Sequence, residues 1–177
     1  MRRRTFLATP LLLPTLTRAT PGATAVAYPP VVPGARLTFP RDHGAHPDFR
    51  TEWWYVTGVL DLPQRDIGFQ LTFFRSRPGT AEALDSPIAA RQILFAHAAL
   101  TLPGDRLRHS ERAARANLGA AFSSEDCDIS IGAWRMRRLD RRDGEAFSLQ
   151  VHSPQFSYDR LLTPTQPLLL QGEGGYS

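Results

Sequence analysis

The stretch that decides the fold is T-E-W-W-Y-V-T-G, at residues 51–58. Successive side chains of a β-strand point to opposite faces of the sheet. A strand here therefore places Trp53 and Tyr55 on one face. Glu52 and Trp54 lie on the other. Because large aromatic side chains stand on both faces, we expect the strand to be buried on both sides or to line a ligand cavity with one of them.

The residues that follow continue as strands separated by turns. Residues 68–75 alternate apolar and polar side chains, and we expect them to pair with residues 53–61 as a hairpin. Residues 108–117, rich in arginine, alanine and glutamate, are the one segment that we expect to be helical. The chain is therefore predicted to be all-β, as an antiparallel barrel or a sandwich, with the barrel preferred. Further strands are expected at 91–102, 128–139 and 147–152, with a hairpin turn at 140–145.

The first 27 residues have the three regions of a signal peptide. M-R-R-R is followed by an apolar run at 11–16 and by A-x-A cleavage sites at 23–25 and 25–27. The apolar run is far shorter than the ~20 residues that span a bilayer. R-R-T-F-L at 3–7 resembles the twin-arginine pattern, with an ordinary secretory signal as the alternative. We therefore expect a periplasmic or secreted protein, with residues 28–50 as an extended N-terminal segment and residues 51–177 as a β domain.

The charge outside the signal segment is balanced. The protein has 21 basic residues, all of them arginine, and 17 acidic residues. Four arginines lie in the signal segment, which leaves 17 against 17 and a net charge of zero. A nucleic-acid-binding domain carries a basic stripe on its surface, so we expect no nucleic-acid partner. The single cysteine, Cys127, excludes an intrachain disulfide.

The chain ends on L-L-Q-G-E-G-G-Y-S at 169–177, with no strand that would close a sheet. Such an end leaves a sheet edge without a partner. We expect the β domain to be incomplete at its C-terminal end, or a second domain to be missing from this chain. The alternative is a flexible tail of the kind that many domains have.

Several blocks, in this order, resemble one family. They are F-P-R-D-H-G-A-H-P-D-F-R-T-E-W-W-Y-V-T-G at 39–58, G-F-Q-L-T-F-F-R at 68–75, F-A-H-A-A-L at 95–100 and L-L-Q-G-E-G-G-Y-S at 169–177. Together they resemble the carotenoid 1,2-hydratase and AttH-like group of lipocalin-like proteins, often labelled predicted secreted hydrolases. The resemblance covers nearly all of the chain after the signal segment. It implies two consecutive lipocalin-like β-barrel domains, of which this chain is similar to the first.

The resemblance implies two functions of different classes. One is an exported enzyme that adds water to an isoprenoid or other apolar alkene by acid catalysis. The other is an exported, non-catalytic protein that binds an apolar ligand. Both have an apolar small molecule or lipid as partner, and we also expect a peripheral membrane contact. No cofactor is predicted, because the chain has neither a phosphate-binding loop nor a dinucleotide fingerprint. It also lacks the G-x-S-x-G motif of a hydrolase nucleophile.

Glu52 and His97 are the candidate catalytic residues. An alkene is protonated by a strong acid, and a carboxyl group kept neutral by an apolar pocket is a suitable donor. The alternative for Glu52 is a salt bridge to Arg50 or Arg75. The alternative for His97, which is flanked by alanines in an apolar strand, is a hydrogen-bonded core histidine.

The candidate ligand-binding residues are Trp53, Trp54, Tyr55, Phe73 and Arg75. Aromatic faces attract cations and would stabilise the carbocation of a hydration. The alternative for the three adjacent aromatic residues is packing in the core.

His43 and His46 have two aspartates nearby and faintly resemble metal ligands. There is no helix to align them and no clear third ligand, so no metal site is predicted. A pair of loop histidines is the expectation.

Overall fold

The computed structural model describes residues 26–63, 65–104 and 107–175. The signal-peptide prediction for residues 1–27 falls almost wholly outside these residues. One short 3-10 helix, η1 (Arg41–His43), precedes nine strands. The described residues contain no helix with the length and apolarity to cross a bilayer. The strands are β1 (Thr51–Leu62), β2 (Arg65–Ser76), β3 (Ile93–Thr101), β4 (Arg108–Ala116), β5 (Gly119–Phe122), β6 (Asp128–Ile131), β7 (Trp134–Arg141), β8 (Gly144–His152) and β9 (Ser157–Leu162).

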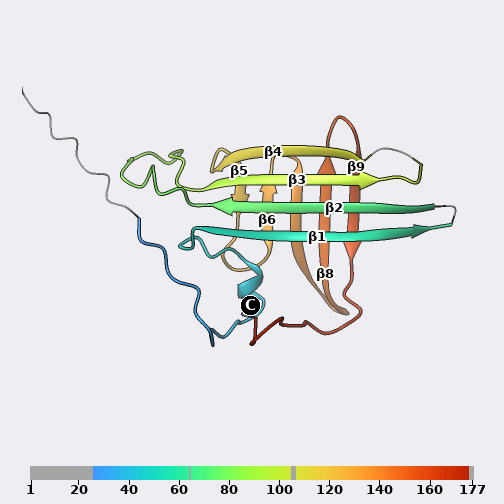
Figure 1. Ribbon diagram of the computed structural model, residues 1–177, viewed down its shortest axis with the longest axis horizontal. Helices are drawn as coiled ribbons and strands as arrows, with labels where there is room; N and C mark the ends of the chain where they lie inside the picture. Colours follow the sequence, from blue (N-terminus) through green and yellow to red (C-terminus); the bar gives the residue numbers. More distant parts are fainter. Residues whose placement is uncertain (1–25, 64, 105–106, 176–177) are drawn as a thin grey trace, which may run out of the picture.

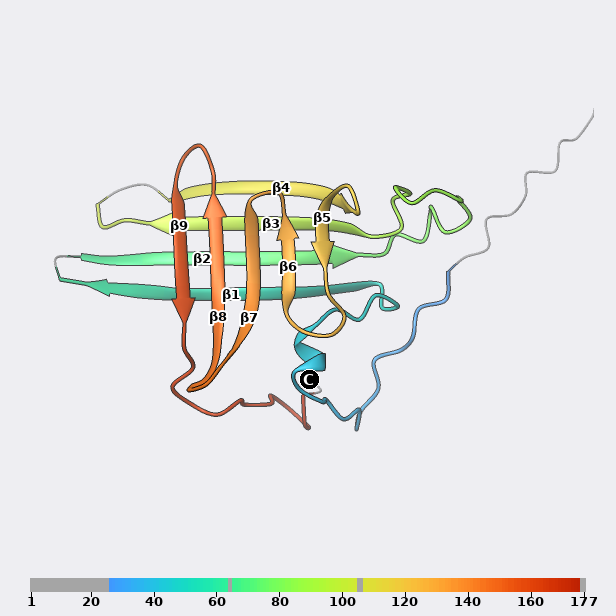
Figure 2. The ribbon, with the colours of Figure 1, turned by 180° about the vertical axis from the view of Figure 1, so that it is seen from behind.

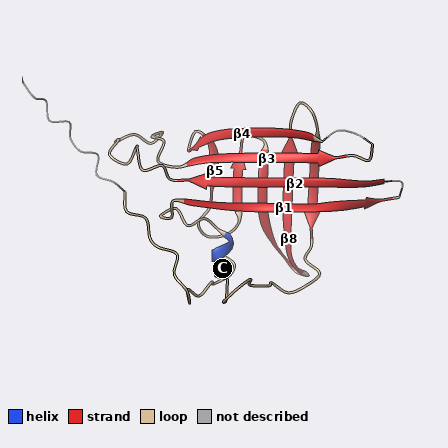
Figure 3. Ribbon diagram, viewed as in Figure 1, coloured by secondary structure: helices blue, strands red, loops and turns tan. Residues whose placement is uncertain are grey.

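All nine strands belong to one sheet that follows the order of the chain. Each strand is antiparallel to the next except for β4 and β5, which are parallel. Strands β1 to β4 form one layer and β5 to β9 cross behind it, so the sheet is curled into a half-barrel (Figures 1, 2 and 3). The prediction of an all-β, lipocalin-like fold is confirmed. Strands β1 and β9 are the two edges of the sheet, which leaves the half-barrel open on one side.

The alternation predicted for the aromatic strand is confirmed. Trp53 and Tyr55 are 59% and 62% exposed, on the outer face of the sheet. Trp54 and Val56 are partly buried and pack against the core from the inner face. The predicted hairpin of β1 with β2 is also present, with Trp54 opposite Phe73.

The core lies between the two layers. Trp134 from β7 and Phe73 from β2 are fully buried in it, and Trp134 donates a hydrogen bond of 2.9 Å to the carbonyl of His152. Phe73 is flanked by Leu71 on its own strand and lies opposite Ala96 on β3. These side chains fix the curvature of the sheet, because the inner faces of both layers must bury them together.

Two predictions about secondary structure are wrong. The expected helix at 108–117 is strand β4, where Ser110, Arg112 and Ala114 alternate as half-buried residues against exposed neighbours. Pairing with β3 and burial of one face outweigh the helix propensity of arginine and alanine. The expected strand at 128–139 is two strands, β6 and β7. Gly132, with φ of 57°, makes the turn between them.

Candidate functional site

An ion pair on the inner face of the sheet lies at the centre of the candidate site. Glu52 of β1 and Arg75 of β2 are directly opposite each other in the ladder. Arg75 Nε donates to Glu52 Oε2 over 2.6 Å, and the Arg75 side chain is completely buried. The salt bridge that the sequence left open as the alternative for Glu52 is therefore present, with Arg75 rather than Arg50.

The Arg75 guanidinium is fully used. Nη2 donates to the carbonyls of His46 and Phe49 at 2.8 and 3.0 Å. Nη1 donates to the Pro47 carbonyl at 3.3 Å and to Gln92 Oε1 at 2.6 Å. With the bond to Glu52, these contacts satisfy five N–H donors, the full number that an arginine side chain carries. The loop at 46–49 is thus wrapped around the buried cation.

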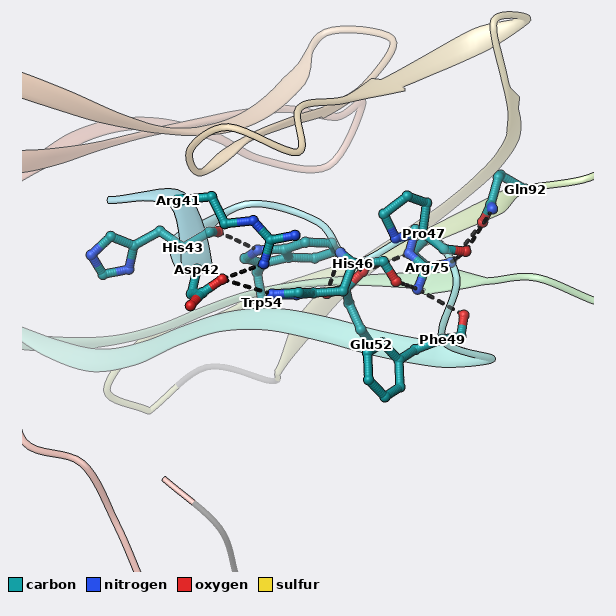
Figure 4. A network of polar contacts seen from close by, with 10 residues as sticks. All are labelled: Arg41, Asp42, His43, His46, Pro47, Phe49, Glu52, Trp54, Arg75 and Gln92. Carbon is teal, nitrogen blue, oxygen red and sulfur yellow. Dashed lines mark hydrogen bonds and ion pairs between the residues drawn. The ribbon is translucent and has the colours of Figure 1, made fainter. Parts of the chain in front are cut away.

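His46 lies between two carboxylates (Figure 4). Its Nδ1 is 2.9 Å from Glu52 Oε1 and its Nε2 is 3.1 Å from Asp42 Oδ1. The backbone N–H of His46 also donates to both oxygens of Glu52, at 3.0 and 2.9 Å. Each ring nitrogen therefore has a carboxylate oxygen within hydrogen-bond distance. The row Asp42, His46, Glu52 and Arg75 therefore alternates carboxylates with nitrogen-bearing side chains, an imidazole and a guanidinium.

Helix η1 is held against this row. Trp54 Nε1 donates to the His43 carbonyl over 2.9 Å. Asp42 accepts hydrogen bonds from the backbone N–H of Thr38 and from the Arg41 side chain. These contacts lower the pKa of Asp42 from 3.8 to about 2, and the hydrogen bond from Thr38 has the largest effect. Asp42 therefore stays ionised through most of the acid range, opposite the His46 ring.

A pocket of about 410 Å³ opens on one side of the row, at the mouth of the half-barrel. Its apolar lining comes from Trp54 and Val56 of β1, Met136 of β7 and Phe147 of β8. We call it the barrel-mouth pocket. Its polar lining consists of Asp42, His43, His46 and Glu52.

His43 lines the barrel-mouth pocket with a ring that packs against two aromatic side chains. Its ring packs 4.5 Å from Phe39 and 5.7 Å from Phe147, measured between ring centroids. Burial lowers the pKa of His43 below its ordinary 6.5, against the opposing charge of Glu145. The side chain therefore presents a largely apolar, neutral imidazole to the pocket near neutral pH.

A second pocket, of about 420 Å³, lies on the other side of the same row. Asp42, His46 and Glu52 line both pockets. The second one is enclosed by the N-terminal segment and by Gly174 and Gly175 of the C-terminal tail. We call it the terminal pocket.

The structure does not bring Glu52 and His97 together. Glu52 faces the inner side of the sheet, whereas His97 lies on the outer face, with half of its side chain exposed. The His97 ring packs 5.4 Å from Phe74, and its Nε2 is 4.0 Å from Glu111. The alternative of a core histidine is therefore wrong.

The candidate ligand-binding residues are also divided between two faces. Trp54 lines the barrel-mouth pocket with its indole packed against the core. Phe73 is a core residue that lines neither pocket, and Arg75 is buried beneath the loop. Trp53 and Tyr55 point outward, although both contribute atoms to the rim of the barrel-mouth pocket. The alternative of core packing therefore holds for Trp54 and fails for Trp53 and Tyr55.

His46 was missed as a site residue by sequence reasoning. The signal was present in D-H-G-A-H-P-D-F-R at 42–50, where acids and histidines crowd before an aromatic strand. The spacing of His43 and His46 faintly resembled that of metal ligands. In the structure the loop turns back, so that His46 contacts Glu52 near the start of β1. Asp48 points away and pairs with Arg77 at 3.3 Å. Among the described residues, no three histidine, cysteine, aspartate or glutamate side chains are arranged so that they could hold a metal ion.

Comparisons with known proteins agree with this architecture. A family model described as AttH-like matches residues 30–177. A crystal structure of a protein designated AttH, from Nitrosomonas europaea, is similar to this chain with a TM-score of 0.70 and 41% sequence identity. The match covers 84% of this chain and 44% of that protein, so the chain spans less than half of its length. No curated protein matches the sequence.

Proposed function

The chain belongs to the AttH-like family, and from that premise we propose that it binds an apolar small molecule in the barrel-mouth pocket, as part of an exported protein. The observation that carries this proposal is the pocket itself. Its volume of about 410 Å³ lies within the range of small-molecule sites, about 300–1,000 Å³. Four apolar side chains on three strands form its walls, and a row of polar groups closes one end. This combination suits a ligand with a long apolar body and one polar group.

The partners of Glu52 favour binding over acid catalysis. A carboxylic acid that protonates an alkene works best in an apolar pocket with no cationic partner. Glu52 instead accepts hydrogen bonds from a buried arginine and from the His46 backbone and ring. The same contacts hold the loop and β1 in place, so they give the pocket a rigid wall.

A hydratase is the second candidate, and one observation favours it. Glu52 and His46 line the barrel-mouth pocket, so an acid–base pair faces the space where an alkene would lie. In such a reaction a proton is added to one alkene carbon, and the oxygen of water is added to the other. The Glu52–His46 pair would give a proton to the alkene carbon and would then take up the proton that the attacking water releases, which restores the donor.

Export is part of the proposal because it determines which ligands the protein meets. The M-R-R-R start, the apolar run and the A-x-A sites of residues 1–27 support a periplasmic or secreted location. A lipid or isoprenoid outside the cytoplasm is therefore the ligand class that we propose. Attachment of the mature domain to a membrane surface is a further part of the same proposal.

A pair of valine substitutions on one strand tests the binding site. Val56→Trp fills the barrel-mouth pocket, whereas Val59→Trp adds the same indole to the exposed outer face of β1. Apolar species that copurify with the exported protein are identified by mass spectrometry, and their affinity is measured by fluorescence titration. We expect Val56→Trp to weaken binding at least about tenfold, since one displaced apolar group of this size is worth that much. Equal binding by both variants, or no enriched apolar species, would refute the proposal.

Isotope labelling separates binding from hydration. The protein is incubated with the identified ligand in ¹⁸O-labelled water, and incorporation into the product is followed by mass spectrometry. A binding protein leaves the ligand unlabelled. A hydratase incorporates one labelled oxygen per turnover and loses this activity in Glu52→Gln, whose folding is checked by its melting temperature.

A further inference from the structure

Six exposed aliphatic side chains lie on two segments, residues 31–37 and residues 168–170. Val31 is 71% exposed and Leu169 is 82% exposed. Soluble monomers rarely leave contiguous apolar surface in water, and such patches commonly mark contact sites. We call this set the terminal patch. Its members are Val31, Val32, Leu37, Leu168, Leu169 and Leu170.

The two segments of the patch are in contact. Gly175 lies beside both Leu37 and Leu170: a Cβ placed there would stand 2.9 Å from Leu37 Cδ1 and 4.0 Å from Leu170 Cδ2. Figure 1 shows the C-terminal tail reaching the N-terminal segment next to helix η1. The terminal pocket lies between them and is lined by Val31, Val32 and Leu37 together with Gly174 and Gly175. Val31, Val32 and Leu37 therefore share one hollow with the C-terminal tail, and Leu170 lies beside its wall at Gly175.

The rim of this surface is polar. Arg36, Arg41 and Asp42 line the terminal pocket beside the valines and leucines. An apolar centre inside a polar rim is the usual composition of a protein–protein contact. Phe49 adds an aromatic side chain to the lining. The chemistry of the patch thus fits a polypeptide surface that presents apolar side chains.

The position of the patch and the length of the relative favour polypeptide beyond the described residues as the occupant. The Nitrosomonas europaea protein is matched over 44% of its length, so more than half of it lies outside the matched region. The last described residue of the present chain, Gly175, is itself part of the pocket wall. Polypeptide that continues from this point begins at the patch and has a high effective concentration for it.

We propose that the terminal patch is the docking surface for the polypeptide that follows residue 177 in the full-length protein. That polypeptide covers Leu168–170 and inserts an apolar side chain into the terminal pocket. The docked polypeptide would contact Asp42, His46 and Glu52, which line the terminal pocket and also form the polar end of the barrel-mouth pocket. The inference does not depend on whether a ligand binds in the barrel-mouth pocket.

The experiment uses the complete gene product and measures the accessibility of its aliphatic side chains by hydroxyl-radical footprinting. Leu161 and Val59 are exposed on the strands and serve as internal references. We expect Leu169 and Val31 to be modified at least about fivefold more slowly than these references, because an interface core excludes solvent. Modification of Leu169 as fast as the references would overturn the proposal, and so would a coding sequence that stops after residue 177.

Two matched variants identify the occupant. Leu169→Asp introduces a charge into the patch at a side chain that the described fold leaves exposed, and Val59→Asp introduces the same charge on β1. We expect Leu169→Asp to restore rapid modification of Val31 and Val32, whereas Val59→Asp leaves them protected. Val32→Asp provides a second variant and should expose Leu169. Protection that disappears on dilution, together with a dimer by light scattering, would assign the patch to a second copy and refute the proposal. Protection that appears only with anionic lipid vesicles would likewise refute it.

Discussion

Glu52 and Arg75 face each other across the first hairpin with 2.6 Å between Oε2 and Nε, and the pair binds a loop as well as a strand. The carboxylate accepts from the His46 backbone and ring, while the guanidinium donates to three carbonyls of residues 46, 47 and 49. A buried charge is stable when it is both paired and hydrogen-bonded. The pair therefore fixes the position of the segment that separates the two pockets.

Arg75→Met should destabilise the protein strongly. It removes the cation but retains an apolar side chain of similar length. The Glu52 carboxylate loses its cationic partner, and the carbonyls of residues 46, 47 and 49 each lose a hydrogen bond from the guanidinium. Breaking one side of a buried pair costs about 3–5 kcal/mol, which we expect as the loss in the free energy of unfolding. Urea denaturation followed by tryptophan fluorescence measures it.

The matched control is Arg137→Met. Arg137 is half-exposed, and its Nε is 3.6 Å from Asp128, so the same substitution should cost only about 0–1 kcal/mol. If both variants lose similar stability, the network around Arg75 has no special structural role.

Stability should fall in acid partly because of Asp42. The pKa of this carboxyl is about 2 in the folded protein and 3.8 ordinarily, so the unfolded chain binds a proton at higher pH than the folded one. The stabilisation is therefore complete above about pH 4 and is lost as the pH falls toward 2. We expect the difference in urea midpoint between the wild type and Asp42→Asn to shrink over this range. Asp143→Asn, at an exposed turn residue, should follow the wild type throughout.

Gly44→Ala tests how closely the loop after η1 approaches the loop before β6. A Cβ at this position would stand 2.8 Å from the backbone carbon of Ser124 and 2.9 Å from the backbone nitrogen of Asp126. Backbone atoms cannot move aside as a flexible side chain does, so we expect a loss of about 1–3 kcal/mol in unfolding free energy. Gly68→Ala meets Thr101 Cβ at 3.4 Å, an ordinary contact, and should change stability by less than about 0.5 kcal/mol. Equal effects of the two substitutions would contradict this close approach.

Cys127 should be unreactive in the folded protein. Burial raises the pKa of its thiol from 9.0 to about 12, and the reactive species is the thiolate. At about pH 8 we therefore expect an aromatic disulfide reagent to label native Cys127 roughly a thousandfold more slowly than the urea-unfolded chain. Rapid labelling before unfolding would mean that the barrel-mouth pocket, which Cys127 lines, opens to solvent.

Much of the fold follows from local pattern. Alternation in residues 51–58 and 68–75 correctly predicted the first hairpin and which residues share a face, because a strand has a fixed two-residue period. Strand β4 escaped prediction because its inward residues, Ser110, Arg112 and Ala114, are not the large apolar residues that mark a buried face. Their burial depends on β3 and on Trp134, over which the Arg112 guanidinium lies at 5.1 Å from the ring.

The candidate site was predictable only in part. Strand alternation placed Glu52 on the same face as Trp54, and the sequence offered Arg75 as one of two possible ion-pair partners. The structure shows that this face is the inner one. The contact of His46 with Glu52 was not predicted, because the path of an irregular loop does not follow from a repeating pattern of side chains. The relative position of the two candidate catalytic residues, Glu52 and His97, depends on the register of β1, β2 and β3. That register places them on opposite faces of the sheet.

The sequence by itself determined the all-β class, the first hairpin, the family resemblance and which side chains of the aromatic strand share a face. All of these depend on interactions between near neighbours along the chain or on blocks of residues in a fixed order. Only the tertiary structure decided that Arg75 binds the loop at 46–49, that His46 lies between Asp42 and Glu52, and that one row of side chains separates two pockets. The physical reason is that a buried guanidinium must satisfy all its donors, and the nearest carbonyls in space are supplied by a loop 26 to 29 residues away in sequence.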